Sequence, residues 1–204
     1  MALGTATDGY ELRFDAGRIC LDLLSTSHPG ERLDSVEPLR AWITGSGLVP
    51  PGTPLAHADG SWLGGFRELR DCVGVLVRAV AKAQAPGPGY ERRPHDLALA
   101  RLNEIARPAP PAPRAVPGED GRFVRELDRP PHCAALLAAV ARDAVELLTD
   151  PVVRAAVREC EGGNCTIMYL DTSRGRRRRW CSSEICGNRE RVARHRRRAA
   201  LTRA

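Results

Sequence analysis

"CEGGNCTIMYLDTSRGRRRRWCSSEIC", residues 160–186, contains four cysteines arranged in two pairs. Four residues separate the cysteines within each pair, and fifteen residues separate the pairs. Zinc takes four ligands at tetrahedral corners, and two short pairs joined by a hairpin supply them with little loss of chain entropy. The stretch is too polar to bury four thiols without a reason. The spacing therefore predicts a zinc site formed by Cys160, Cys165, Cys181 and Cys186.

The residues between the cysteines favour a hairpin followed by a helix. Two glycines at 162–163 suit a tight knuckle, and residues 166–171 (TIMYLD) are rich in β-forming side chains. Residues 178–180 (RRW) are expected to return as the second strand. Ser182 or Ser183 is expected to cap a helix whose first turn carries Cys186. This order predicts a small treble-clef-like zinc module.

Composition favours helices for the rest of the chain. Hydrophobic residues make up 43% of the 204 residues but aromatic residues only 4%, so Ala, Leu and Val must form most of the core. Such a core is typical of packed helices. We therefore predict a mainly α fold, with a helical N-terminal domain (1–150) that includes a short β element and a C-terminal zinc module (151–204).

Apolar spacing locates the expected elements. Residues 10–14 (YELRF) alternate between apolar and polar side chains, which predicts a short strand. In a helix predicted at 96–106, Leu99, Leu102 and Ile105 are expected to face the core. The element at 19–26 (ICLDLLST) is either a strand or a helix. The predicted helices span residues 35–48 with Ser35 as N-cap, 62–80, 96–106, 133–148, and a last one that opens with Asp150 and Pro151 and leads to Cys160.

Two further features complete this reading. Residues 107–120 (RPAPPAPRAVPGED) are rich in proline and are expected to form an extended, solvated linker or loop. Cys20, Cys72 and Cys133 lie in apolar surroundings without a partner nearby in sequence, so we expect them to fill the core.

Charge divides the chain into two unequal parts. Residues 1–150 hold 17 Lys and Arg against 20 Asp and Glu, whereas residues 151–204 hold 14 against 5. A compact cationic module is suited to a polyanionic partner. Guanidinium groups bind phosphates and guanine edges in a forked geometry, so nucleic acid is the expected partner. The candidate nucleic-acid contacts are Arg176, Arg177, Arg178, Arg179, Arg191, Arg194, Arg197 and Arg198, opposite a packing arc of Ile185, Val192, Ala193, Ala199 and Ala200.

These residues carry a family resemblance. The stretch 160–198, with YLDTS, RRWCS and the tetrapeptide CGNR at 186–189, resembles the CGNR zinc finger. The stretch LDLLST at 21–26, followed by Trp42, resembles the ABATE domain that precedes this finger in predicted bacterial stress-response regulators, although Ser25 stands where that family usually has Asn. The resemblance implies a DNA-binding transcriptional regulator whose N-terminal domain senses a ligand or mediates contacts.

Further polar residues are candidates for supporting roles. Asp171 is expected to pair with Arg189 and, together with Asn188, to support the metal ligands and lock the hairpin to the helix. Asp22, Ser25 and Thr26 are polar positions in an apolar stretch. They predict either a pocket for a small-molecule effector or simple helix capping.

The sequence also bears on whether the protein is an enzyme, on the alternatives to DNA binding and on its location in the cell. Four thiolate ligands leave zinc no open position, and we find no acid–base pair or phosphate-binding glycine loop, so we do not expect an enzyme. The alternatives to a DNA-binding regulator are a zinc-stabilised protein- or RNA-interaction module and a thiol-based redox sensor. No apolar run approaches the ~20 residues of a membrane span, and no signal peptide is recognised, so a cytoplasmic protein is expected. A dimer is compatible with the sequence.

Overall fold

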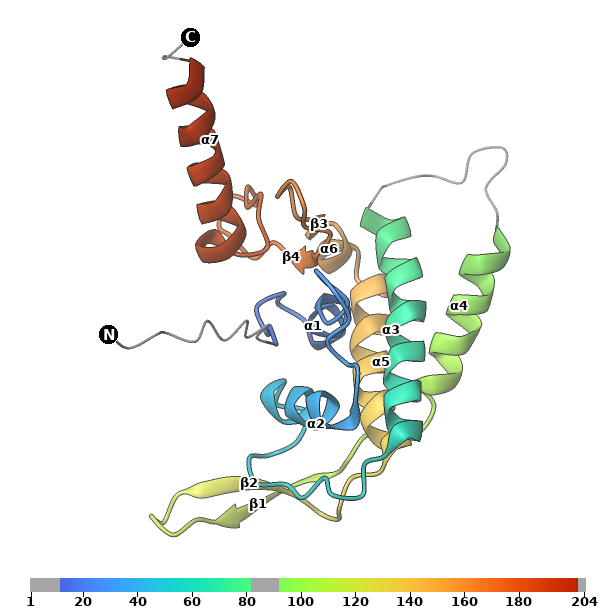
Figure 1. Ribbon diagram of the computed structural model, residues 1–204. Helices are drawn as coiled ribbons and strands as arrows, with labels where there is room; N and C mark the ends of the chain where they lie inside the picture. Colours follow the sequence, from blue (N-terminus) through green and yellow to red (C-terminus); the bar gives the residue numbers. More distant parts are fainter. Residues whose placement is uncertain (1–11, 82–91, 202–204) are drawn as a thin grey trace.

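The computed structural model describes residues 12–81 and 92–201, and within residues 197–201 it describes side-chain surroundings only for Arg198. The fold is mainly helical, as predicted (Figure 1). The long helices α3 and α5 lie side by side, α4 packs against both, and α1 and α2 cover the opposite side. The helices are α1 (Ile19–Ser25), α2 (Val36–Gly45), α3 (Gly60–Ala81), α4 (Arg92–Ile105), α5 (Cys133–Thr149), α6 (Pro151–Arg154) and α7 (Asn188–Leu201).

Helix α3 is the centre of the hydrophobic core. Its apolar residues recur every three or four positions, which places them on one face of a helix. Trp62, Phe66, Leu69, Val73 and Leu76 are all buried, in the helix predicted over residues 62–80. The ring of Phe66 meets the ring of Trp42 from α2 edge to face, with the centroids 5.7 Å apart.

The first elements differ in detail from the prediction. The undecided stretch at 19–26 forms helix α1, and its residues from Cys20 onward are buried. Ser35 precedes α2 as predicted, but its side chain makes no capping bond and instead donates to Asp34. Leu12–Phe14 form no strand, and the first two residues of that predicted strand lie outside the described residues.

The proline-rich stretch is a loop only in part, because its middle forms a β-strand. Residues Pro113–Pro117 form strand β1, which pairs antiparallel with β2 (Phe123–Leu127) in an exposed hairpin. Prolines are tolerated at the ends of an edge strand, where no ladder N–H is required. Gly121 turns the chain with φ +76°.

In α4, the prediction that Leu99 faces the core is wrong. The side chain of Leu99 is exposed, and that of Ala98 is buried in its place.

The second hairpin has a different pairing from the expected one. Asp150 caps α6 by accepting bonds from the amides of Val152 and Val153, but this helix ends after one turn. The chain continues as β3 (Val157–Glu159), which pairs antiparallel with β4 (Met168–Leu170). The predicted pairing of 166–171 with 178–180 is therefore wrong, because the cysteine knuckle itself connects the two strands. Residues 178–180 run beside the knuckle, where the Glu161 amide donates to the Arg179 carbonyl at 2.9 Å.

Strand β4 joins the zinc module to the N-terminal part. The Leu170 amide donates to the Ala16 carbonyl at 2.8 Å, and the Ala16 amide donates to Asp22 Oδ1 at 2.9 Å. Gly17 follows with φ +90°, and a Cβ there would lie only 3.2 Å from Leu170 Cβ. The buried side chain of Tyr169 belongs to the same hydrophobic cluster as the helices. The two parts therefore share a continuous core.

Replacing Asp22 with asparagine should change how stability depends on pH. Burial raises the pKa of Asp22 from 3.8 to about 6. A carboxyl whose folded pKa is raised stabilises the fold as the pH falls through that pKa, and its ionised form costs stability above it. From about pH 7.5 to about pH 5, the zinc-loaded wild type should gain ~1 kcal/mol relative to Asp22→Asn.

Chemical denaturation at several pH values measures this difference. The matched control is Asp96→Asn, because Asp96 is exposed on α4. If the stability of Asp22→Asn changed with pH in the same way as that of the wild type, folding would not raise the pKa of Asp22 and the prediction would be wrong.

Candidate metal centre and basic surface

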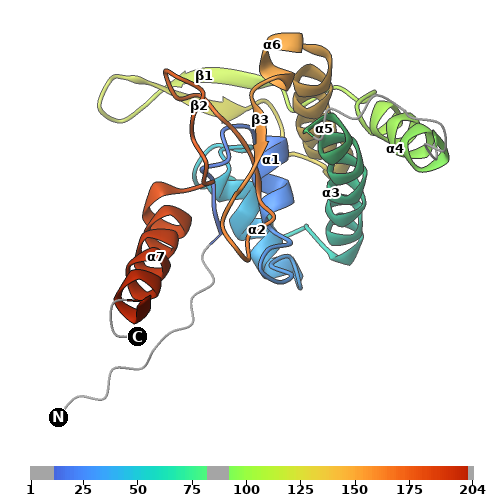
Figure 2. The same cartoon turned by 90° about the horizontal axis from the view of Figure 1, so that it is seen from above.

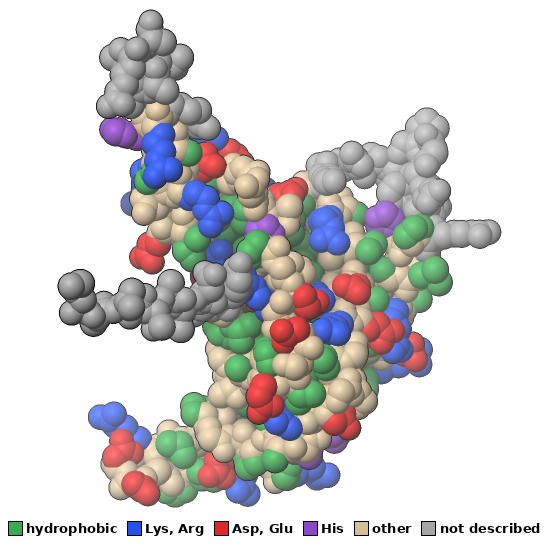
Figure 3. All heavy atoms as spheres, viewed as in Figure 1, with side chains coloured by type: hydrophobic (Ala, Val, Ile, Leu, Met, Phe, Trp, Pro, Cys, Tyr) green, Lys and Arg blue, Asp and Glu red, His purple; other side chains and the backbone are tan. Residues whose placement is uncertain are grey.

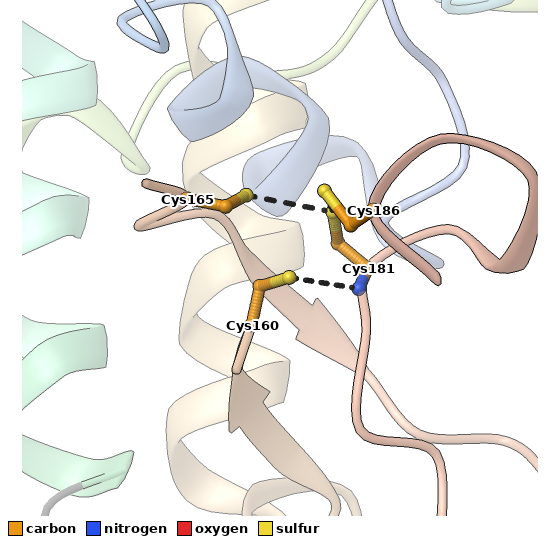
Figure 4. Close-up of side chains that lie close together, drawn as sticks. All are labelled: Cys160, Cys165, Cys181 and Cys186. Carbon is orange, nitrogen blue, oxygen red and sulfur yellow. Dashed lines mark hydrogen bonds between the residues drawn. The ribbon is translucent and has the colours of Figure 1, made fainter. Parts of the chain in front are cut away.

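The four predicted cysteines come together at one point. Cys160 follows β3, Cys165 precedes β4, and the loop and short π-helix η1 (Ser183–Gly187) supply Cys181 and Cys186 (Figure 4). All four side chains are buried, and their sulfurs lie within 4.8 Å of one another. Cys181 Sγ lies 3.7 Å from Cys165 Sγ and 3.6 Å from Cys186 Sγ. Tetrahedral zinc with bonds of about 2.3 Å needs sulfurs ~3.8 Å apart, so this cluster fits the ion.

Local backbone bonds hold the cysteines in place. The Cys165 amide donates to the Gly162 carbonyl at 3.0 Å, which closes the knuckle. The Cys181 amide donates to Cys160 Sγ at 3.3 Å, which connects the two pairs. Ser182 begins the turn that carries Cys186, because its Oγ accepts from the Ile185 amide at 3.2 Å. The predicted serine cap is therefore confirmed.

Four cysteine thiolates this close together need a cation to balance their negative charge. Hydrogen bonds from Cys165 and Cys181 hold the pKa of Cys160 well below its usual range. The same bonds to Cys160 raise the pKa of Cys165 and raise that of Cys181 to about 11. Zinc would hold all four as thiolates and connect the knuckle to η1.

Arg13 is a residue that the sequence did not predict. It lies 168 positions before Cys181, yet its Nη1 donates to Cys181 Sγ at 3.4 Å, while its Nη2 pairs with Asp15 at 2.7 Å. Hydrogen bonds and cations next to metal ligands tune and orient them. No local pattern could have predicted this contact, because only the pairing of β4 with Ala16 brings the N-terminal segment to the cluster.

The predicted pairing of Asp171 with Arg189 is wrong. Asp171 is buried and accepts bonds from the Ser173 amide, the Ser173 hydroxyl and the Arg178 amide. It therefore stabilises the turn that leads from Asp171 to Arg178, and the donors of this turn occupy both of its carboxylate oxygens. Arg189 and Asn188 are exposed in the first turn of α7.

The predicted nucleic-acid contacts fall into two groups. The Arg178 guanidinium bonds to the carbonyls of Trp180 and Cys181 and covers the Tyr169 ring at 4.7 Å, so it supports the module instead of facing a partner. Arg179 pairs with Glu161 at 2.5 Å. Arg179 is nevertheless exposed, as are Arg176, Arg177, Arg191, Arg194 and Arg198, and the Arg191 guanidinium donates to the Ser183 carbonyl at 3.2 Å. The side chain of Arg197 lies outside the described residues.

Helix α7 projects away from the rest of the molecule (Figures 1 and 2). Cationic side chains lie along the described part of α7 on the face seen in Figure 3. The expected packing arc is wrong at Ile185 and Val192, which are 46% and 43% exposed, because the projecting helix has little protein beside it. The side chains of Ala199 and Ala200 lie outside the described residues.

Family comparison agrees with this architecture. Residues 17–151 match the ABATE family, described as "putative stress-induced transcription regulator", and residues 156–199 match the CGNR zinc finger. The chain belongs to the ABATE family. No curated protein is similar enough in sequence to match. No helix among the described residues has both the length and the hydropathy of a membrane span.

The three residues predicted to form a ligand pocket divide in this ABATE-family chain. Ser25 and Thr26 line a cavity of 360 Å³, but Asp22 does not. Asp22 instead holds Ala16, and the hydroxyls of Ser25 and Thr26 donate to carbonyls of Asp22 and Leu23. Their hydroxyls thus terminate α1, as the capping alternative proposed.

The purified protein should contain about one zinc ion per chain, and Cys181→Ser should lose it. Structural zinc contributes roughly 10–16 kcal/mol at neutral pH in small modules, more than the packing of such a module replaces. Residues 156–199 should therefore lose their fixed structure in this variant. Metal analysis and amide hydrogen exchange measure the two effects.

Cys72→Ser is the matched control, because Cys72 lies on α3 away from the cluster. The control should keep its zinc and its exchange pattern. A zinc-free wild type, or a Cys181→Ser protein with native protection in residues 156–199, would contradict the assignment.

Proposed function

We propose that this protein is a zinc-dependent DNA-binding transcriptional regulator. The observation that carries the proposal is the attachment of α7 to the metal cluster. Cys186 lies in η1, which leads directly into α7. The metal therefore sets the position of a projecting, arginine-rich helix relative to the body of the protein.

The charge on α7 supports a nucleic-acid partner. Glu190 is its only acidic residue, and no acidic residue follows it in the chain. Arg191, Arg194 and Arg198 are spaced three and four positions apart, so they share one face. The major groove of B-DNA admits an α-helix, and arginine binds both phosphates and guanine edges there. Arg176 and Arg177, exposed in the preceding turn, are suited to the adjacent backbone.

The proposed role is binding and not catalysis. Four cysteine ligands complete the coordination of a structural zinc ion, so no position is left for a substrate. The zinc-module arginines that have internal partners, such as Arg178, strengthen the frame that presents the others. The description of the matched family, putative stress-induced transcription regulator, supports a regulatory role.

Salt dependence measures the number of phosphates that the arginines neutralise. With five exposed arginines in contact, the slope of log affinity against log salt should be about −4 to −5, since each contact contributes about −0.9. Arg194→Ala should flatten the slope by about one unit. Arg122→Ala is the matched control, because Arg122 lies on the exposed hairpin and should not contribute.

The same titrations, repeated after zinc removal and with heparin or RNA as competitor, separate the alternatives. Zinc removal should abolish duplex binding if the metal positions α7. Binding that survives without zinc and disappears with modest heparin would identify the stretch as a basic tail without a defined site. Stronger binding to RNA than to duplex DNA would favour the RNA-interaction alternative.

A further inference from the structure

The 360 Å³ cavity lies where the N-terminal segment, the loop after α1 and the zinc module meet. Arg13 comes from the first of these, His28 and Arg32 from the second, and Arg189 from the third. His28 Nδ1 also lies 3.2 Å from the Oγ1 of Thr166, which is the neighbour in sequence of the lining residues Cys165 and Ile167. Side chains from distant parts of the sequence therefore surround one space.

This cavity is larger than a metal site. A single water needs only about 10–15 Å³ of such space, so 360 Å³ accommodates a small organic molecule. Of the four metal ligands, only Cys165 and Cys186 line the cavity. The metal cluster thus forms one part of its wall, and the remaining volume lies toward the loop after α1.

The cavity is lined by cationic side chains, of which Arg13 also pairs with Asp15 outside the lining. Arg13, Arg32 and Arg189 all line it, and none of the described residues that line it carries a carboxylate. Arginine binds carboxylate and phosphate groups in a forked geometry.

Apolar side chains form the rest of the lining. Leu12, Pro29, Ile167 and Ile185 contribute to it, so the cavity has both a cationic and an apolar part. Ligand sites of this kind combine hydrophobic walls with a few polar groups that fix orientation. We propose that the cavity binds a small organic anion, in which a carboxylate or phosphate group is attached to a hydrocarbon or aromatic body.

The location gives the bound anion a route to the metal module. Arg13 contacts Cys181 Sγ, and Arg189 lies in the first turn of α7. An anion held by both would connect the N-terminal segment to the start of the basic helix. Binding of the anion stands on the cavity alone, whereas an effect on DNA affinity rests on the proposed function.

Isothermal titration calorimetry of the zinc-loaded full chain tests the binding step without DNA. The probes are benzoate and phenyl phosphate, which carry the two anionic groups on an aromatic body, and the neutral control is benzamide. We expect saturable binding of at least one anionic probe at one site per chain and no binding of benzamide. Arg32→Gln and Arg189→Gln should each weaken the binding at least tenfold, with an unchanged zinc content.

Arg122→Gln is the matched control and should bind the probe as the wild type does. Three results would overturn the proposal: no saturable heat with either anion up to about 10 mM, beyond the ~1 mM of a weak complex; equal binding of benzamide; or unchanged affinity in both zinc-loaded arginine variants. Because DNA is absent from this experiment, its failure and a failure of DNA binding are separate outcomes.

Discussion

The convergence of four cysteine sulfurs is the interaction on which the zinc module depends. Each pair alone closes only a short turn, and the hairpin of β3 and β4 has three residues in each strand. A sheet of this size is too small to be stable by itself. The shared metal connects the knuckle at 160–165 to η1, and η1 determines where α7 begins. The position of the basic surface is therefore a consequence of the coordination geometry.

The zinc module is also held in place by contacts with the N-terminal part of the chain. Ala16 pairs with β4, Asp22 holds Ala16, and Arg13 reaches the sulfur of Cys181. The bond between Ala16 and Asp22 is buried, and the bond between Arg13 and Cys181 is partly buried. In such surroundings a hydrogen bond is strong, and a polar group left without a partner is costly. A structural change at the cavity between the two parts would therefore also affect the metal cluster.

The sequence predicted the local features well and the long-range ones poorly. The cysteine spacing identified the metal ligands because zinc restricts both the number and the type of its ligands. The stripe of α3 was equally clear, since its period of three to four residues is a property of the helix alone. The partner of β4 and the contact of Arg13 depend on which distant segments meet. A single sequence does not indicate which residues of two strands pair with each other. A short strand that contains prolines, such as 113–117, also has the composition of a linker.

The shared core also orders the events of synthesis. Ile167, Met168 and Tyr169 belong to the same buried cluster as α1, α3 and α5, although they are made after all of these helices. A ribosome delivers the chain from its N-terminus, so the helices emerge with part of their apolar surface uncovered. Completion of the core must wait for β4, and closure of the metal cluster must wait for Cys186. A chain that stops early would thus expose the surface by which quality-control proteases recognise unfinished proteins.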